Sequence, residues 1–116
     1  MDLSHVILRI VVTDLPTSTL WYQRMLEVEP MEPDDGTSVF MLTPSTALQL
    51  REEDEVTSTA PGCDLSMRVP DLVDAVAHVE ALGIAHSEVV TLGETSGMFV
   101  VQDPDGREVT FLQVAS

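Results

Sequence analysis

The chain has 116 residues, of which 44% are hydrophobic, so it can bury the core of one compact domain. Its 20 acidic residues outnumber five arginines, lysine is absent, and the net charge of −15 argues against nucleic acid as a partner. No apolar run approaches the roughly 20 residues of a membrane span, and the start MDLSHV lacks the basic and apolar segments of a signal peptide. With a single cysteine, Cys63, these features predict a cytoplasmic protein without an internal disulfide.

An internal repeat organises the chain. The pattern V-x-D-L occurs at residues 12–15 and again, 57 positions later, at 69–72. A helix-like stretch of about ten residues follows each copy, and Gly83 is placed to end the second helix. That second stretch carries the i, i+4, i+7 spacing of a buried helix face, at Leu72, Val76 and Val79.

Strand-like runs complete each copy of the repeat. SVFML and ALQLRE follow a PDDG turn in the first copy, and GMFVV and REVTFLQ flank a DPDG turn in the second. In DPDG the proline fixes φ, the aspartate bonds its own backbone and the glycine takes the difficult dihedral. A weaker strand is expected directly after each helix, in VEPMEP and AHSEVV. The sequence thus predicts two β-α-β-β-β modules, about 1–52 and 62–116, joined by an acidic linker that contains Pro and Gly.

Alternation along the strands predicts which residues face the core. The apolar positions are expected to pack on the helices: Val6, Leu8, Ile10, Val12, Leu48, Leu50, Leu65, Met67, Val69, Val109 and Phe111. The opposite face would then carry His5, Ile7, Arg9, Val11, Ala47, Gln49, Arg51, Asp64, Ser66, Arg68, Glu108, Thr110 and Leu112. Three of the five arginines share this second face. They either form internal ion pairs, with Asp64 and Glu108 as neighbours, or bind an oxygen-rich ligand through their guanidinium groups.

Three stretches of the sequence resemble the vicinal oxygen chelate superfamily, which groups glyoxalase I, extradiol dioxygenases and bleomycin-resistance proteins. They are VVTDLPTSTLWYQRML, VPDLVDAVAHVEALGI and FVVQDPDGREVTFLQ, and together they cover nearly the whole chain. The resemblance implies an α+β fold in which two βαβββ modules form a cup-shaped mixed sheet. It also implies a homodimer, sometimes with modules exchanged between chains, and places Trp21 and Tyr22 in the helix core.

The superfamily's enzymes hold a divalent metal inside the cup through His and Glu or Gln side chains. Carried onto this chain, the four ligand positions are Ile7, Gln49, Asp64 and Thr110. Isoleucine cannot ligate a metal and threonine is a poor ligand, so no metal or other cofactor is expected. His5 is the remaining candidate ligand beside Gln49 and Asp64, but it lies two residues before Ile7, about 7 Å along the strand.

No other catalytic constellation is present in the sequence. There is no nucleophile elbow, Cys63 has no local histidine partner, and His78 and His86 are expected at the surface.

The expected function is non-catalytic binding of a small molecule, an antibiotic or natural product, with resistance by sequestration. One alternative is a metal-dependent glyoxalase-like lyase, isomerase or dioxygenase with an atypical metal site, and another is a ligand-sensing accessory module. The expected ligand-binding residues are His5, Ile7, Arg9, Gln49, Arg51, Asp64, Ser66, Arg68 and Thr110.

Overall fold

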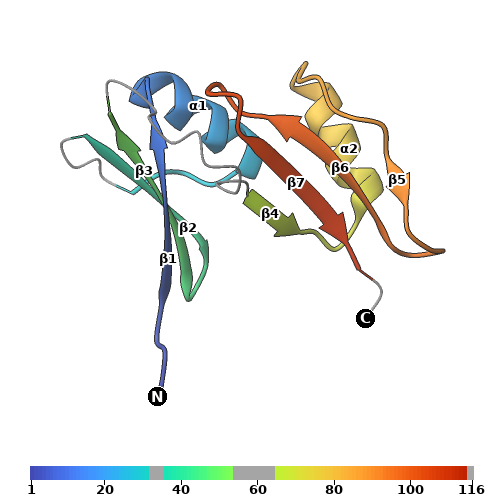
Figure 1. The fold of residues 1–116 in the computed structure, drawn as a ribbon, viewed down its shortest axis with the longest axis horizontal. Coiled ribbons are helices and arrows are strands. Elements are labelled where there is room, and N and C mark those ends of the chain that lie inside the picture. Colours follow the sequence, from blue (N-terminus) through green and yellow to red (C-terminus); the bar gives the residue numbers. More distant parts are fainter. Residues whose placement is uncertain (32–35, 54–64, 115–116) are drawn as a thin grey trace. The chain divides into compact units, whose positions relative to one another are not determined.

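A computed structural model describes residues 1–31, 36–53 and 65–114 of the chain. The chain divides into two compact units, Met1–Ala60 and Pro61–Ser116. The first contains β1 (Val6–Val12), α1 (Leu15–Leu26), β2 (Thr37–Thr43) and β3 (Thr46–Glu52) (Figure 1). The second contains β4 (Leu65–Arg68), α2 (Leu72–Ala81), β5 (Val90–Thr91), β6 (Gly97–Gln102) and β7 (Glu108–Gln113). In the part of the chain that the structure describes, no helix is long and apolar enough to span a bilayer.

The first unit packs α1 on a three-stranded mixed sheet. The strand order is β1-β3-β2, with β1 parallel and β2 antiparallel to β3. Side chains of alternate strand residues meet the helix, as the sequence predicts. The buried residues of this unit include Ile10, Val12, Phe40, Leu48 and Leu50 from the sheet and Tyr22 and Met25 from the helix.

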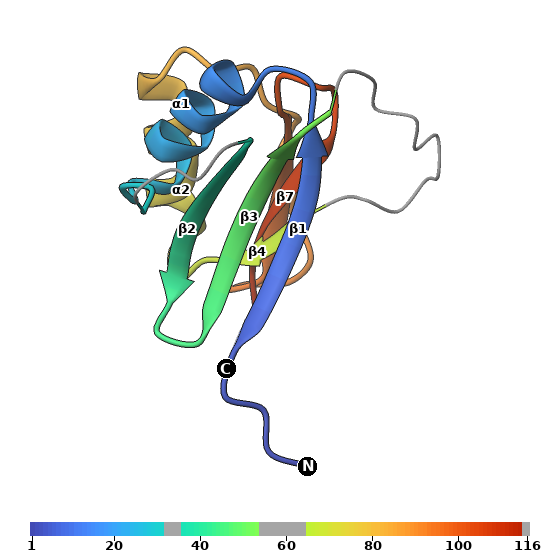
Figure 2. The same cartoon turned by 90° about the vertical axis from the view of Figure 1, so that its left-hand side faces the viewer.

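The first half of β1 departs from the expected burial. Val6 and Leu8 were predicted to pack on a helix, but they are 45% and 43% exposed, whereas Ile10 and Val12 are buried. Figure 2 shows α1 over one end of the sheet, while β1 and the β2–β3 hairpin continue past it. A helix of 12 residues is about 18 Å long and a strand of seven about 23 Å. The helix is therefore too short to cover the whole strand.

The second unit packs α2 on a four-stranded mixed sheet in the order β4-β7-β6-β5. Strand β4 runs parallel to β7, and β6 is antiparallel to both of its neighbours. Phe99 and Phe111 stack with their ring centroids 5.3 Å apart. A Cβ at Gly97 would lie only 3.0 Å from Leu72 Cδ2 and from the carbonyl oxygen of Val90, so glycine allows α2 and β5 to approach β6 closely.

The repeat predicted from V-x-D-L is confirmed in the structure. Asp14 and Asp71, 57 residues apart, each precede a helix in an extended conformation and accept a bond from a backbone N–H of its first turn. Gly83 has a φ of +74°, as expected for the residue that ends α2.

The strand expected directly after each helix is largely absent. In the second unit it is reduced to the two residues of β5 and an isolated bridge between His86 and Val101. In the first, residues 28–31 are not a strand, although Met31 N–H donates to Val39 O at 2.8 Å; residues 32–35 lie outside the described part. Strand β3 ends at Glu52, where the first predicted module gives way to the predicted linker. Residues 54–62 of that linker lie outside the described residues.

Candidate functional site

The side of the first sheet that faces away from α1 is called the helix-free face below. It carries nine side chains: Ile7, Arg9 and Val11 of β1, Ala47, Gln49 and Arg51 of β3, and Thr37, Val39 and Met41 of β2. The register arranges them in rows that cross the sheet. One row is Ile7–Ala47–Met41 and the next is Arg9–Gln49–Val39. Strand alternation correctly predicted the β1 and β3 members, except that Ala47 is itself buried.

Arg9 and Gln49 are joined at the centre of this face. The Arg9 Nε–H donates to Gln49 Oε1 at 2.6 Å, between residues directly opposite one another on parallel strands. Arg9 is exposed and Gln49 half-buried. A guanidinium has five N–H donors, so this bond fixes its orientation while using one of them.

Arg51 is the second cation of the helix-free face. Its Nε lies 3.8 Å from Glu53 Oε1, and the two side chains are 55% and 44% exposed. An ion pair of this length and exposure contributes little to stability. Arg51 therefore keeps its charge available to the face.

The matching face of the second sheet is organised differently. Ser66 lies opposite Thr110 and Arg68 opposite Leu112. Arg68 Nη2 donates to the backbone oxygen of Val114 at 3.2 Å. Of the two internal ion-pair partners expected for the arginines, Asp64 lies outside the described residues and Glu108 is exposed. Among described residues the three arginines bond to Gln49, Glu53 and Val114, so the alternative of internal pairing with Glu108 is not seen.

The described residues at the superfamily's ligand positions do not fit a divalent metal. Ile7 has no donor atom, and Gln49 Oε1 already accepts from a guanidinium, whose positive charge would repel a second cation beside it. His5 precedes β1 rather than lying on it, and its Nδ1 is 3.2 Å from Ser4 Oγ. Within the described ranges, no three His, Cys, Asp or Glu residues gather as a metal would require.

The histidines and aromatic residues of the helices belong to the packing. Tyr22 is fully buried and meets Trp21 edge-on at 4.7 Å, as predicted. His86 was expected at the surface, but its ring packs edge-on against Phe99 at 5.5 Å and lies 3.6 Å from Glu80 Oε2. His78 is also half-buried. The sequence did not show this for His86 because Phe99, the ring that it packs against, lies 13 residues further along the chain.

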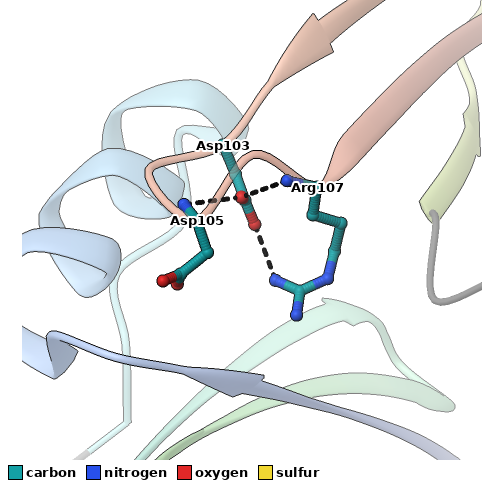
Figure 3. A network of polar contacts seen from close by, with 3 residues as sticks. All are labelled: Asp103, Asp105 and Arg107. Atoms are coloured by element: carbon teal, nitrogen blue, oxygen red, sulfur yellow. Dashed lines mark hydrogen bonds and ion pairs between the residues drawn. The ribbon is translucent and has the colours of Figure 1, made fainter. Parts of the chain in front are cut away.

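A buried ion pair at the DPDG turn was missed in the sequence. Asp103 Oδ1 accepts from the backbone N–H groups of Asp105 and Arg107, both at 2.9 Å. Its Oδ2 accepts from Arg107 Nη1 at 2.7 Å (Figure 3). The spacing of four residues in DPDGR was the available signal. This network holds the hairpin between β6 and β7, and its carboxylate is fully used.

Two modules of this topology characterise the glyoxalase/bleomycin-resistance fold, and solved structures share it with this chain. A glyoxalase/bleomycin resistance protein from Catenulispora acidiphila superposes with a TM-score of 0.80 at 23% identity, covering 96% of this chain and 98% of that one. The bleomycin resistance determinant encoded on transposon Tn5 gives 0.78 at 17% identity, covering 95% and 97%.

The same fold is found in a protein with a bound metal. The fosfomycin resistance protein FosX from Listeria monocytogenes, in complex with Mn(II) and a dihydroxypropylphosphonic acid, gives a TM-score of 0.71 at 15% identity, covering 95% of this chain and 87% of that one. No protein-family model and no curated protein matches the sequence. These likenesses establish the fold, and the function has to be argued from the site.

Proposed function

We propose that this protein binds a small organic molecule without transforming it, and that the helix-free face of the first sheet is part of the binding surface. The bond between Arg9 and Gln49 is the observation that carries the proposal. It puts a fixed cation beside Gln49, which is the residue with a donor atom among the first module's two superfamily ligand positions, Ile7 and Gln49. A metal-assisted reaction would lack both a ligand and a favourable field there.

Sequestration of an antibiotic or natural product is the form of binding that we favour. Structural neighbours include a bleomycin resistance determinant, whose fold matches this chain over nearly its whole length. Ser66, Arg68, Thr110 and Asp64 remain proposed ligand contacts of the second module, as His5 and Arg51 do of the first.

The first prediction is that the purified protein carries no stoichiometric divalent metal. Elemental analysis after dialysis should find well below one Zn, Ni, Fe or Mn per chain, because Ile7 and the engaged Gln49 leave too few ligands. A thermal-shift screen should agree. Metals should leave the melting temperature unchanged, whereas a bound natural product at a hundred times its Kd should raise it by about 10 °C.

Two variants make the metal test decisive. His5→Ala removes the histidine that the sequence offers as a candidate ligand, and His78→Ala removes a histidine on α2 as the control. About one metal per chain in the wild type, lost in His5→Ala and retained in His78→Ala, would overturn the proposal in favour of an enzyme.

A further inference from the structure

The helix-free face has a charge opposite to that of the chain. The protein carries 20 acidic residues and five arginines. Yet of the nine described residues on this face, two are arginines and none is acidic. Among the described residues, the carboxylate in contact with one of these arginines is that of Glu53, just beyond β3 and 3.8 Å from Arg51. In an acidic protein, such a face is a local positive region that favours an anion.

Arg9 is oriented for recognition of a planar anion. The bond from its Nε to Gln49 holds the guanidinium plane and leaves the terminal Nη groups, which form the usual fork for a carboxylate or phosphonate. Much of the conformational entropy of the Arg9 side chain is thus already lost in the free protein, so ligand binding costs less. Gln49 also retains its side-chain NH₂ group, a neutral donor next to the same fork.

The row beside Arg9 is apolar. Ile7, Ala47 and Met41 lie opposite one another across the three strands, and Ile7 is 63% and Met41 37% exposed. On the other side of Arg9 in the same strand is Val11. A ligand that places its anionic group at Arg9 can therefore bury an apolar body against the neighbouring row.

We infer that the ligand is an amphiphilic organic anion: a carboxylate, phosphonate or phosphate that is bound by Arg9, with an aromatic or aliphatic body on Ile7, Ala47 and Met41. This inference rests on the proposed binding function and names its ligand class. Arg51, about 7 Å from Gln49 along β3, strengthens the positive field and donates to a second oxygen of a larger ligand. A second copy of this chain would instead bring an acidic, bulky surface to the face. The experiment distinguishes a small organic anion from a second copy as the occupant.

The experiment is a titration of ¹⁵N-labelled full-length protein with 2-naphthoate, neutral 2-naphthamide and inorganic phosphate, followed by NMR. Naphthoate should shift the Arg9 Nε–H and Gln49 side-chain resonances together with the amides of β1 and β3. Naphthamide, which has the same body without charge, should bind at least about tenfold more weakly. Phosphate should shift the same two side chains weakly, because it lacks the body.

The variants test Arg9 against bulk charge. Arg9→Leu should weaken naphthoate binding by about tenfold to a hundredfold. Arg9→Lys, which keeps the charge without the fork, should fall between Arg9→Leu and the wild type. Arg24→Leu is the matched control, since it removes the same charge from α1, on the other side of the sheet; it should change the affinity by less than about twofold.

Each other result overturns the inference in a recognisable way. Equal binding of naphthamide and naphthoate at this face would refute the anionic class while leaving the binding proposal intact. Equal losses in Arg9→Leu and Arg24→Leu would show that only bulk charge matters. If the resonances of this face shift when the protein is diluted and do not respond to any of the three probes, a second copy occupies the face.

Discussion

Asp103 is a buried carboxylate with both oxygens engaged. Its side chain is fully buried and that of Arg107 is 8% exposed. One oxygen closes the turn by accepting two backbone N–H groups, and the other pairs with the guanidinium. A buried charge of this kind is tolerated only because its partners are all present.

Asp103→Asn should destabilise the protein by about 3–5 kcal/mol. The new amide could keep one acceptor for the turn, but its NH₂ would face Arg107 Nη1, donor against donor, and the guanidinium would lose its counter-charge. Urea unfolding followed by circular dichroism measures the effect. Glu108→Gln, an exposed neighbour with the same charge change, should alter the free energy of unfolding by less than about 0.5 kcal/mol. Equal stability of the two variants would contradict this account.

The sequence predicted some residues of the candidate site and missed their partners. Strand parity placed Arg9 and Gln49 on one face because side-chain direction is a local property. It could not place them opposite each other, since the register of β1 against β3 depends on some 40 intervening residues. For the same reason, strand parity left open whether the arginines of this face pair internally, and their described partners are Gln49, Glu53 and Val114. Turn chemistry likewise predicted that Asp103 bonds its own backbone, but not that Arg107 would be buried with it.

At the scale of elements, the two helices begin in the same way. Asp14 and Asp71 accept from first-turn N–H groups, and a second device repeats as well. Leu15 N–H donates to Glu52 Oε2 at 2.7 Å, and Leu72 N–H donates to Gln113 Oε1 at 2.6 Å. In both units, therefore, a polar side chain at the end of the last strand, β3 or β7, accepts a hydrogen bond from the first N–H of the helix. This bond ties the start of the helix to that strand.

Asp71→Ala should lower the free energy of unfolding by about 1 kcal/mol, within a range of about 0.5–2 kcal/mol, because two N–H groups of α2 lose their acceptor. Asp71→Asn should stay close to the wild type, since asparagine is an equally good cap. Thermal melts of both variants provide the comparison. If Asn were as harmful as Ala, the residue would act through its charge rather than as a cap.

Elements defined by local signals were predicted well, and those that depend on a neighbour were not. The V-x-D-L repeat specifies helix starts because the capping aspartate and the helix it caps are adjacent in sequence. The strand after each helix carries no such signal: in the second unit it is reduced to β5 and the His86–Val101 bridge, and in the described part of the first to one backbone bond. Val6 and Leu8 have the pattern of buried residues, but whether a helix reaches them depends on its length and path.

The whole molecule combines an apolar edge with a large negative charge. β1 is one of the two edge strands of its sheet, and its first three residues, Val6, Ile7 and Leu8, are all substantially exposed. Exposed apolar edge strands invite pairing with another chain. A net charge of −15 opposes the approach of a second copy.

We expect the apolar contacts at β1 to outweigh the repulsion between two acidic chains. The protein should therefore be a homodimer at micromolar concentration, with a mass by light scattering twice that of one chain. Leu8→Glu should shift this equilibrium to the monomer by adding two charges per dimer at the edge. Val73→Glu, at an α2 position that is 77% exposed, is the control and should leave the dimer in place. A monodisperse wild-type monomer with an intact fold would contradict the prediction.

Because apolar contacts at the β1 edge favour the dimer and the net charge opposes it, the direction in which salt changes the dimer affinity can be predicted. At about 0.01 M salt the Debye length is roughly 30 Å, comparable to a small domain, so the two acidic chains repel each other over their whole width. At about 0.15 M it is roughly 8 Å and most of that repulsion is screened. The apolar contacts change little over the same range. The dimer should therefore tighten as salt is added, in contrast to an interface built on opposite charges, which would weaken. Sedimentation equilibrium at the two salt concentrations measures the change, and a dimer that dissociates with added salt would show that ion pairs rather than the β1 edge hold the chains together.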